Sequence, residues 1–145
     1  MTFSSGNPEP LPAPTRLSAT LDGDLSGVSA IREEVRDLAV RAGFGERAND
    51  VALALAELLA NAIEHGTCPI GVEAWWDGRL CVEVSDSGAG LDRDAVWRSH
   101  PPPPQGDRGR GLWIVRQLMD VVLVESDASG TRVHVELSPE PHIGA

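Results

Sequence analysis

A carboxylate and an amide interrupt an otherwise apolar run over residues 51–63. These residues, Glu57 and Asn61, are four positions apart, so on a helix they share one face, which His65 continues one turn later. Both groups are costly among apolar side chains unless each has a partner. The alternative is that this face is the solvent side of an amphipathic helix, and the spacing alone leaves both interpretations open.

A second segment places Asp86, Gly88 and Gly90 directly after an apolar, strand-like run. Glycines two positions apart allow a flat ligand to approach the backbone, and a carboxylate at a strand end can accept a hydrogen bond from an exocyclic amine. Taken alone, this pentapeptide fits an ordinary Asp/Gly turn better than a binding site.

A third segment, residues 106–112, is glycine-rich and opens a helix. The unpaired N–H groups at such an entry favour a bound anion, and the helix dipole adds to the attraction. Residues 106–116 hold three arginines and one aspartate, a local charge of +2 in a chain whose net charge is −10. This local reversal favours phosphate, although a glycine-capped loop explains the segment equally well on its own.

The elements that must position these residues predict an α+β fold. Amphipathic patterns and turn residues, including Asp77-Gly78 as a hairpin turn, indicate strands at 16–22, 70–76, 79–85, 121–126 and 131–137, and helices at 28–42, 48–65 and 109–120. The order does not alternate strand and helix, so we expect a two-layer α/β sandwich. Its mainly antiparallel mixed sheet is covered on one face by three helices. Residues 1–15 are expected to be a disordered arm, 16–138 the domain and 139–145 a flexible tail.

Composition excludes several classes of function. All twelve basic residues are arginine, so a Schiff-base lysine and a P-loop lysine are both absent. The acidic balance argues against a nucleic-acid or anionic-membrane surface. Two cysteines, Cys68 and Cys81, are too few for a disulfide framework or a zinc site. The apolar run at 51–63 is too short to span a membrane and residues 1–14 do not form a signal sequence, so a cytoplasmic location is expected.

In combination, the three segments resemble the Bergerat-fold (GHKL) ATPase superfamily and, within it, the stand-alone anti-sigma factor/serine kinase family. The resemblance covers residues 16–137 and rests on motifs in a fixed order. The matching residues are Glu57, Asn61, His65 and Gly66 for the N-box, Asp86, Gly88 and Gly90 for the first glycine box, Gly109, Gly111 and Leu112 for the second, and Gly130 and Thr131 for the closing Gly-Thr.

The resemblance implies how the nucleotide is held. Asn61 would coordinate a Mg²⁺ ion that bridges the phosphates. Asp86 would accept a hydrogen bond from the adenine amine, with Thr131 nearby, while Gly88 and Gly90 make room for the base.

The resemblance also implies how the phosphates are held and transferred. Gly109, Arg110 and Gly111, with Leu112 completing the motif, would wrap the phosphates beneath a lid formed by residues 91–108. Arg108 and Arg110 are candidates for offsetting phosphate charge, although the motif does not fix them. Glu57 would act as the general base, a role suited to a partly desolvated carboxylate near the γ-phosphate. Four prolines in the lid would limit its closure.

The implied function is a cytoplasmic, ATP-dependent protein serine/threonine kinase with Mg²⁺ as cofactor. It would phosphorylate an anti-sigma antagonist and, in its other state, hold a sigma factor, with no direct nucleic-acid or membrane contact and with a homodimer as a possible assembly. One alternative is a non-catalytic, nucleotide-dependent binding module. Another is the detached catalytic domain of a sensor histidine kinase. A complete histidine kinase is not expected, because no histidine precedes the nucleotide motifs.

Overall fold

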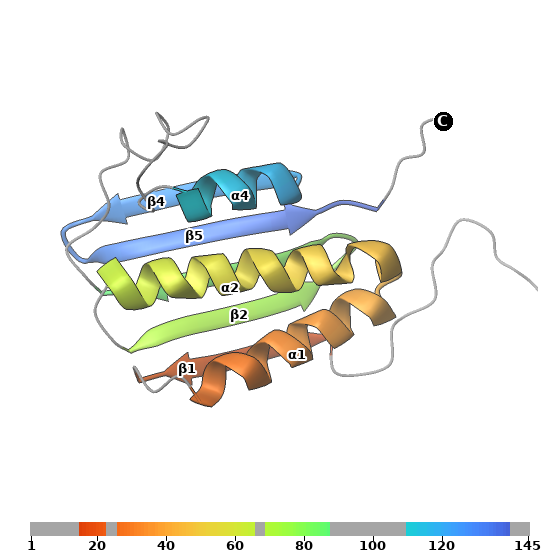
Figure 1. Cartoon of the computed structure of the whole chain (residues 1–145), viewed down its shortest axis with the longest axis horizontal. Coiled ribbons are helices and arrows are strands. Elements are labelled where there is room, and N and C mark those ends of the chain that lie inside the picture. The colour runs from red at the N-terminus through yellow and green to blue at the C-terminus, as the bar shows by residue number, and fades with distance from the viewer. Residues whose placement is uncertain (1–14, 23–25, 66–68, 88–109, 140–145) are drawn as a thin grey trace, which may run out of the picture.

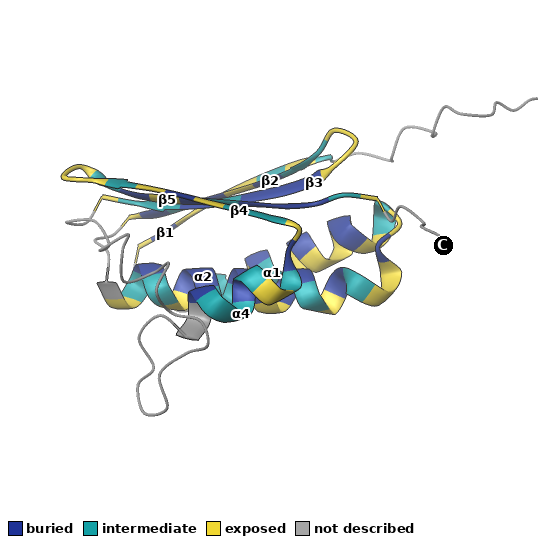
Figure 2. Ribbon diagram, turned by 90° about the horizontal axis from the view of Figure 1, so that it is seen from above, coloured by how far each residue is buried: buried dark blue, intermediate teal, exposed yellow. Residues whose placement is uncertain are grey.

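The structure is a computed structural model that describes residues 15–22, 26–65, 69–87 and 110–139. Strands and helices form two layers, with the sheet on one side and the helices on the other (Figures 1 and 2). The elements in chain order are β1 (Arg16–Leu21), α1 (Ser26–Arg41), the 3₁₀ helix η1 (Gly45–Arg47), α2 (Ala48–His65), β2 (Ile70–Trp76), β3 (Leu80–Asp86), α4 (Arg110–Leu118), β4 (Val121–Asp127) and β5 (Gly130–Leu137).

The five strands form one sheet in the order β1-β2-β3-β5-β4. Each of the four pairs is antiparallel, so the described strands contain no parallel pair that would make the sheet mixed. The helices α1, α2 and α4 all lie on the same face (Figure 2). The α+β class predicted from the sequence, with a helical layer on one side of a mainly antiparallel sheet, is confirmed.

The core lies between the layers and follows the periodicity of each element. On α1 the predicted apolar stripe is buried at Ile31, Val35, Leu38 and Ala39. The central helix α2 contacts α1, α4 and β3, so its two flanks are covered as well as its underside (Figure 1). This placement explains why residues 51–63 are apolar around most of the helix.

Asp120, which follows α4, fixes the C-terminal end of this helix to the end of β5. Its backbone N–H donates to the carbonyl of Glu136 at 2.9 Å, and its carboxylate accepts from the backbone N–H of Ser138 at 2.9 Å. Arg47 approaches the same carboxylate at 3.4 Å. The N-terminal end of α4 therefore points toward the opposite end of the sandwich, where β3 ends and β5 begins (Figure 1).

Most element boundaries agree with the sequence to within two residues, and α2 and β2 agree fully. The short helix η1 was not predicted, because Gly45 reads as part of a helix terminator. Strand β3 extends through Asp86, which the sequence placed just after the strand. The expected arm up to residue 14, the lid at residues 91–108 and most of the tail lie outside the described residues. None of the described helices is long and apolar enough to cross a membrane.

Candidate functional site

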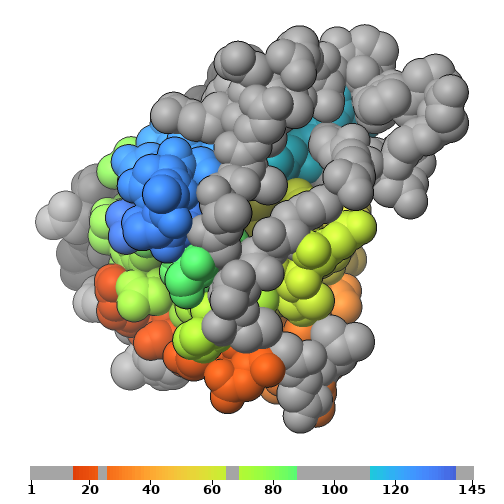
Figure 3. Space-filling model, turned by 90° about the vertical axis from the view of Figure 1, so that its left-hand side faces the viewer, coloured from red at the N-terminus to blue at the C-terminus, as the bar shows by residue number. Residues whose placement is uncertain are grey.

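A pocket opens at the end of the sandwich where β3 ends and β5 begins. Four elements contribute to it: α2, β3, α4 and β5. Figure 3 views this end of the molecule, with the C-terminal part of α2, the end of β3 and the turn between β4 and β5 facing the reader. The lining residues are Leu58, Asn61, Ala62, Val84, Asp86, Leu112, Thr131 and Val133.

Strand alternation and register place the polar residues at the pocket mouth. Side chains two positions apart share a face of the sheet, so Val84 and Asp86 point toward the helices together, as do Thr131 and Val133. Asp86 pairs directly with Thr131 across β3 and β5. The two valines, each less than a tenth exposed, lie one step further in. The pocket therefore has an apolar base and a polar rim.

Thr131 is the most enclosed polar group of the pocket, with only 6% of its surface exposed. Its Oγ1 lies 2.9 Å from the Oγ of Ser126, its direct partner on β4. The sequence analysis did not identify Ser126. The signal was available, because a two-residue turn at 128–129 places Ser126 opposite Thr131 in any regular hairpin.

Gly130 is required by the close approach of the β4–β5 hairpin to β3. Its φ is +148°, and a Cβ built on it would lie 2.0 Å from the backbone oxygen of Asp86. The turn itself is held by Asp127, whose carboxylate accepts from the hydroxyl and the backbone N–H of Ser129 at 2.6 and 2.8 Å. These hydrogen bonds lower the pKa of Asp127 below its ordinary value. A glycine thus allows β5 to carry Thr131 alongside Asp86.

The two polar residues of α2 occupy different positions relative to the pocket. Asn61 is half-buried and contributes to the lining. Glu57 is also half-buried but does not line the pocket, and one turn before it Leu53 is 42% exposed. The helix face that carries both residues therefore runs from the solvent side at Leu53 to the pocket at Asn61.

The second glycine box is described only in part. Leu112 is buried and lines the pocket, and Arg110 and Gly111 form the first residues of α4. Four other predicted site residues lie outside the described residues: Gly88, Gly90, Arg108 and Gly109.

The side chains that line the pocket are suited to a planar ligand that carries polar groups and binds together with a cation. The apolar base can pack against a flat ring, and the carboxylate of Asp86 and the hydroxyl of Thr131 can fix its orientation. The amide oxygen of Asn61 is a hard ligand of the kind that Mg²⁺ prefers. This composition fits the nucleotide and the metal that the sequence motifs imply.

The model of one protein family, the histidine kinase-like ATPase domain, matches residues 21–137. The chain belongs to this family. The resemblance to the GHKL ATPase superfamily stated from the sequence is therefore confirmed, and the pocket lies within the matched segment. A search of curated proteins gave no match.

Solved structures of similar fold agree with this assignment. The RsbU and RsbW domains of Rv1364c from Mycobacterium tuberculosis superpose with a TM-score of 0.64 and 24% identity, over 88% of this chain and 33% of that one. Histidine kinase AdeS of Acinetobacter baumannii gives 0.53 and 14%, over 84% and 67%. The catalytic domain of histidine kinase ThkA gives 0.50 and 15%, over 84% and 95%. At these identities the likeness shows the shared fold, and the chain spans a third of the length of the first structure.

Proposed function

We propose that this chain is an ATP-dependent protein serine/threonine kinase of the anti-sigma type. It phosphorylates an anti-sigma antagonist and, in its other nucleotide state, holds a sigma factor, in the cytoplasm. The observation that carries the proposal is the pocket itself. Asn61, Asp86, Leu112 and Thr131 come from four separate motifs and meet there. The anti-sigma assignment within the family rests on the sequence resemblance, and the Mycobacterium tuberculosis neighbour with an RsbW domain shares the fold.

Adenine recognition follows from the polar rim and apolar base. The carboxylate of Asp86 accepts a hydrogen bond from the exocyclic amine, and the hydroxyl of Thr131, held by Ser126, presents a second polar group beside it. The ring rests against the side chains of Val84 and Val133. Both polar groups stand on adjacent strands, so their spacing is rigid.

The phosphates extend from the pocket toward α2 and the start of α4. Asn61 would hold a Mg²⁺ ion through its amide oxygen, and that ion would supply positive charge to offset the phosphates. The glycine-rich entry to α4, residues 106–111, supplies backbone N–H groups to the anion. Because the chain has no lysine, we assign Arg108 and Arg110 as the cations that offset phosphate charge.

Phosphoryl transfer requires a proton acceptor near the γ-phosphate, and we assign this role to Glu57. The partner's serine or threonine oxygen forms a bond to the γ-phosphorus as the bond to the β-phosphate oxygen breaks. The hydroxyl proton passes to the Glu57 carboxylate, and ADP leaves. Glu57 lies one turn before Asn61 and is partly exposed, which leaves it accessible to a protein partner.

Nucleotide binding is tested by calorimetry with MgADP. Asp86→Asn should weaken binding by ~1–3 kcal/mol, or about 5–150-fold, because an amide that turns its donor toward the adenine amine leaves that amine unpaired. The matched control is Asp77→Asn, the same substitution in the exposed turn at the opposite end of β3. Absence of binding by the unmodified chain at millimolar MgADP would refute the proposal.

Transfer is tested with γ-labelled ATP and protein fractions from the source cells. Glu57→Gln should retain MgADP affinity but lower labelling of a partner serine or threonine by roughly 10²–10⁴-fold. Glu64→Gln, an exposed position on the same helix, is the control and should retain full transfer.

Two outcomes would favour the alternatives. Tight nucleotide binding with no labelled protein in any fraction would support the non-catalytic binding module. Label that is lost in acid, as phosphohistidine is, would instead support a detached histidine kinase domain.

A further inference from the structure

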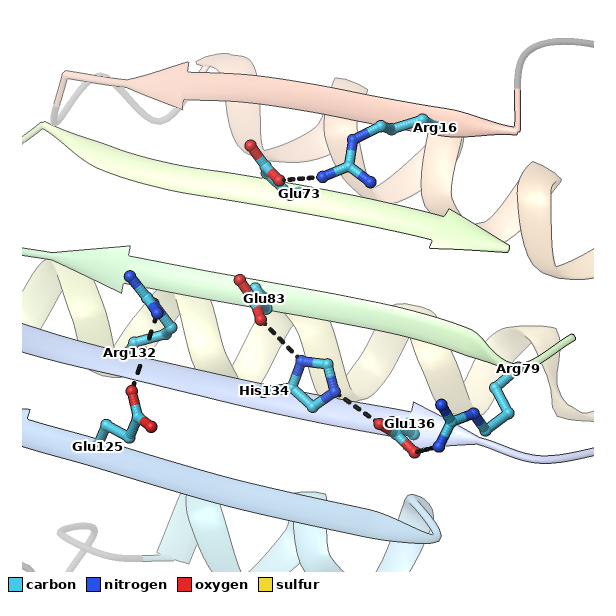
Figure 4. Close-up of polar contacts among 8 residues, drawn as sticks. All are labelled: Arg16, Glu73, Arg79, Glu83, Glu125, Arg132, His134 and Glu136. Atoms are coloured by element: carbon cyan, nitrogen blue, oxygen red, sulfur yellow. Dashed lines mark hydrogen bonds and ion pairs between the residues drawn. The ribbon is translucent and has the colours of Figure 1, made fainter. Parts of the chain in front are cut away.

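The face of the sheet opposite the helices carries a cluster of metal-ligating side chains, which lies on the other side of the strands from the nucleotide pocket. Cys81 on β3 pairs with Glu136 on β5, and in the next row Glu83 pairs with His134. All four lie on the face opposite Val82, Val84 and Val135, which point into the core. Figure 4 shows Glu83, His134 and Glu136 side by side on this face.

Two members of the cluster are buried although the described helices cover the other face. Cys81 is 2% exposed and Glu136 is 9% exposed, whereas Leu123 on the same face is 56% exposed. Part of the shielding comes from Trp75, the neighbour of Cys81 on β2, whose ring lies 5.8 Å from the imidazole of His134. The thiol of Cys81, the imidazole of His134 and the carboxylate of Glu136 thus lie close together and are largely shielded from solvent.

The imidazole of His134 has a carboxylate at each ring nitrogen. Nδ1 lies 2.9 Å from Oε2 of Glu83, and Nε2 lies 2.8 Å from Oε2 of Glu136. A neutral ring can donate through one nitrogen only, so its other lone pair would face an oxygen lone pair. A positive charge, either a second proton or a metal ion, must lie between the ring and one carboxylate.

We propose that Cys81, His134 and Glu136 bind one transition-metal ion of the zinc type. One ligand atom from each residue lies within 4.8 Å of the other two. Zinc bonds of about 2.0–2.3 Å in a tetrahedral site place ligand atoms roughly 3.4–3.6 Å apart, so small side-chain rotations complete the site. A fourth position remains open for water. This proposal departs from the expectation that two cysteines are too few for a zinc site, because histidine and glutamate would supply the other ligands.

The surrounding groups support this assignment. Metal-bound histidines typically donate their second ring N–H to a carboxylate, which is the position that Glu83 occupies at Nδ1. Nε2 is then the coordinating atom. Arg79 donates through Nη1 to Oε1 of Glu136 at 2.9 Å and leaves Oε2 facing the ring. The charges of Arg79, Glu83, Glu136 and a Cys81 thiolate sum to −2, so a divalent cation would neutralise these four groups.

The ligand types select the metal. A thiolate and an imidazole favour Zn²⁺ and Co²⁺ over the hard cations Mg²⁺ and Ca²⁺, so this site and the nucleotide pocket take different ions. The metal would also link β3 to β5, the two strands that carry Asp86 and Thr131. Its binding should therefore raise the thermal stability of the chain without any nucleotide present.

The test is a titration of the full chain with Co²⁺ at pH 8, followed by displacement with Zn²⁺. Burial raises the pKa of the Cys81 thiol to about 11, so the metal must displace a proton and acidic buffers are avoided. We expect one equivalent of Co²⁺ to bind with a thiolate charge-transfer band. Cys81→Ser should abolish the band, and His134→Gln and Glu136→Gln should each weaken binding at least tenfold. Cys68→Ser is the matched control and should keep the band.

A second readout is thermal unfolding with and without Zn²⁺. At a zinc concentration 100-fold above the dissociation constant, the unmodified chain and Cys68→Ser should melt ~5–10 °C higher, whereas folded Cys81→Ser should show no shift. His134→Gln serves the same comparison if the serine variant does not fold. A band that follows Cys68, or no thiolate band at all, would overturn the proposal and leave the cluster as a hydrogen-bonded network.

Discussion

Gly130→Ala tests whether the approach of the β4–β5 hairpin to β3 builds the pocket. A Cβ at residue 130 would lie 2.0 Å from the backbone oxygen of Asp86 and 2.9 Å from the Cα of Ser87, and the φ of +148° is unfavourable for alanine. Backbone strain and overpacking together should lower the free energy of unfolding by about 2–4 kcal/mol. Relief of the clash must also move Asp86 away from Thr131, so MgADP affinity should fall about tenfold, the equivalent of one hydrogen bond.

The matched control is Gly78→Ala. Gly78 has a φ of +99°, but nothing lies within 4 Å of a Cβ built on it. This substitution adds the strain without the clash, so it should cost only about 1 kcal/mol and leave nucleotide affinity unchanged. Urea unfolding and MgADP calorimetry on both variants measure the difference. If Gly130→Ala is no more destabilised than Gly78→Ala and binds MgADP equally well, the assigned contact does not shape the site.

Four further results are expected. Asn61→Ala should lose more nucleotide affinity in the presence of Mg²⁺ than in the presence of a chelator, as measured by calorimetry. Equal losses under the two conditions would make Asn61 a structural residue rather than a metal ligand. Ser126→Ala should weaken MgADP binding about fivefold through the freed Thr131 hydroxyl, whereas a purely structural serine would change only the melting temperature. In the metal-free Cys68→Ser variant, iodoacetamide should alkylate Cys81 of the folded chain at pH 8 about 100-fold more slowly than Cys81 of the urea-unfolded chain. The reason is that folding raises the pKa of the Cys81 thiol from 9.0 to about 11. Because the folded state keeps the Cys81 thiol proton to a higher pH than the unfolded state does, the free energy of unfolding should fall as the pH rises from 9 to 11.

The helix α2 illustrates which structural features are determined by the local sequence pattern. Its bounds, Ala48–His65, follow from periodicity and the glycine after it, and they agree with the structure. The spacing of Glu57 and Asn61 fixes a shared face, but not what that face meets. The packing of α4 and the end of β3 against α2 places Asn61 at the pocket and leaves Glu57 beside exposed Leu53.

In the sheet, some strand pairings are likewise determined by residues close in sequence and others by residues far apart. The hairpins β2–β3 and β4–β5 are readable from the sequence because short turns fix their register. The pairing of β3 with β5 has no such local signal, since residues 87–129 separate the two strands. That pairing places Asp86 opposite Thr131 on one face and Cys81 opposite Glu136 on the other.

The sequence by itself determined the family, the order of the elements and most of the residues that meet at the pocket. These features depend on motifs and on periodicity, which act over a few residues. The tertiary structure alone decided the register of non-consecutive strands, the contact of Gly130 with the backbone of Asp86, and the meeting of a cysteine, a histidine and a glutamate on the outer face of the sheet. Such contacts are fixed by how the helical layer and the sheet pack as a whole, because the energy of each contact depends on residues distant in the chain.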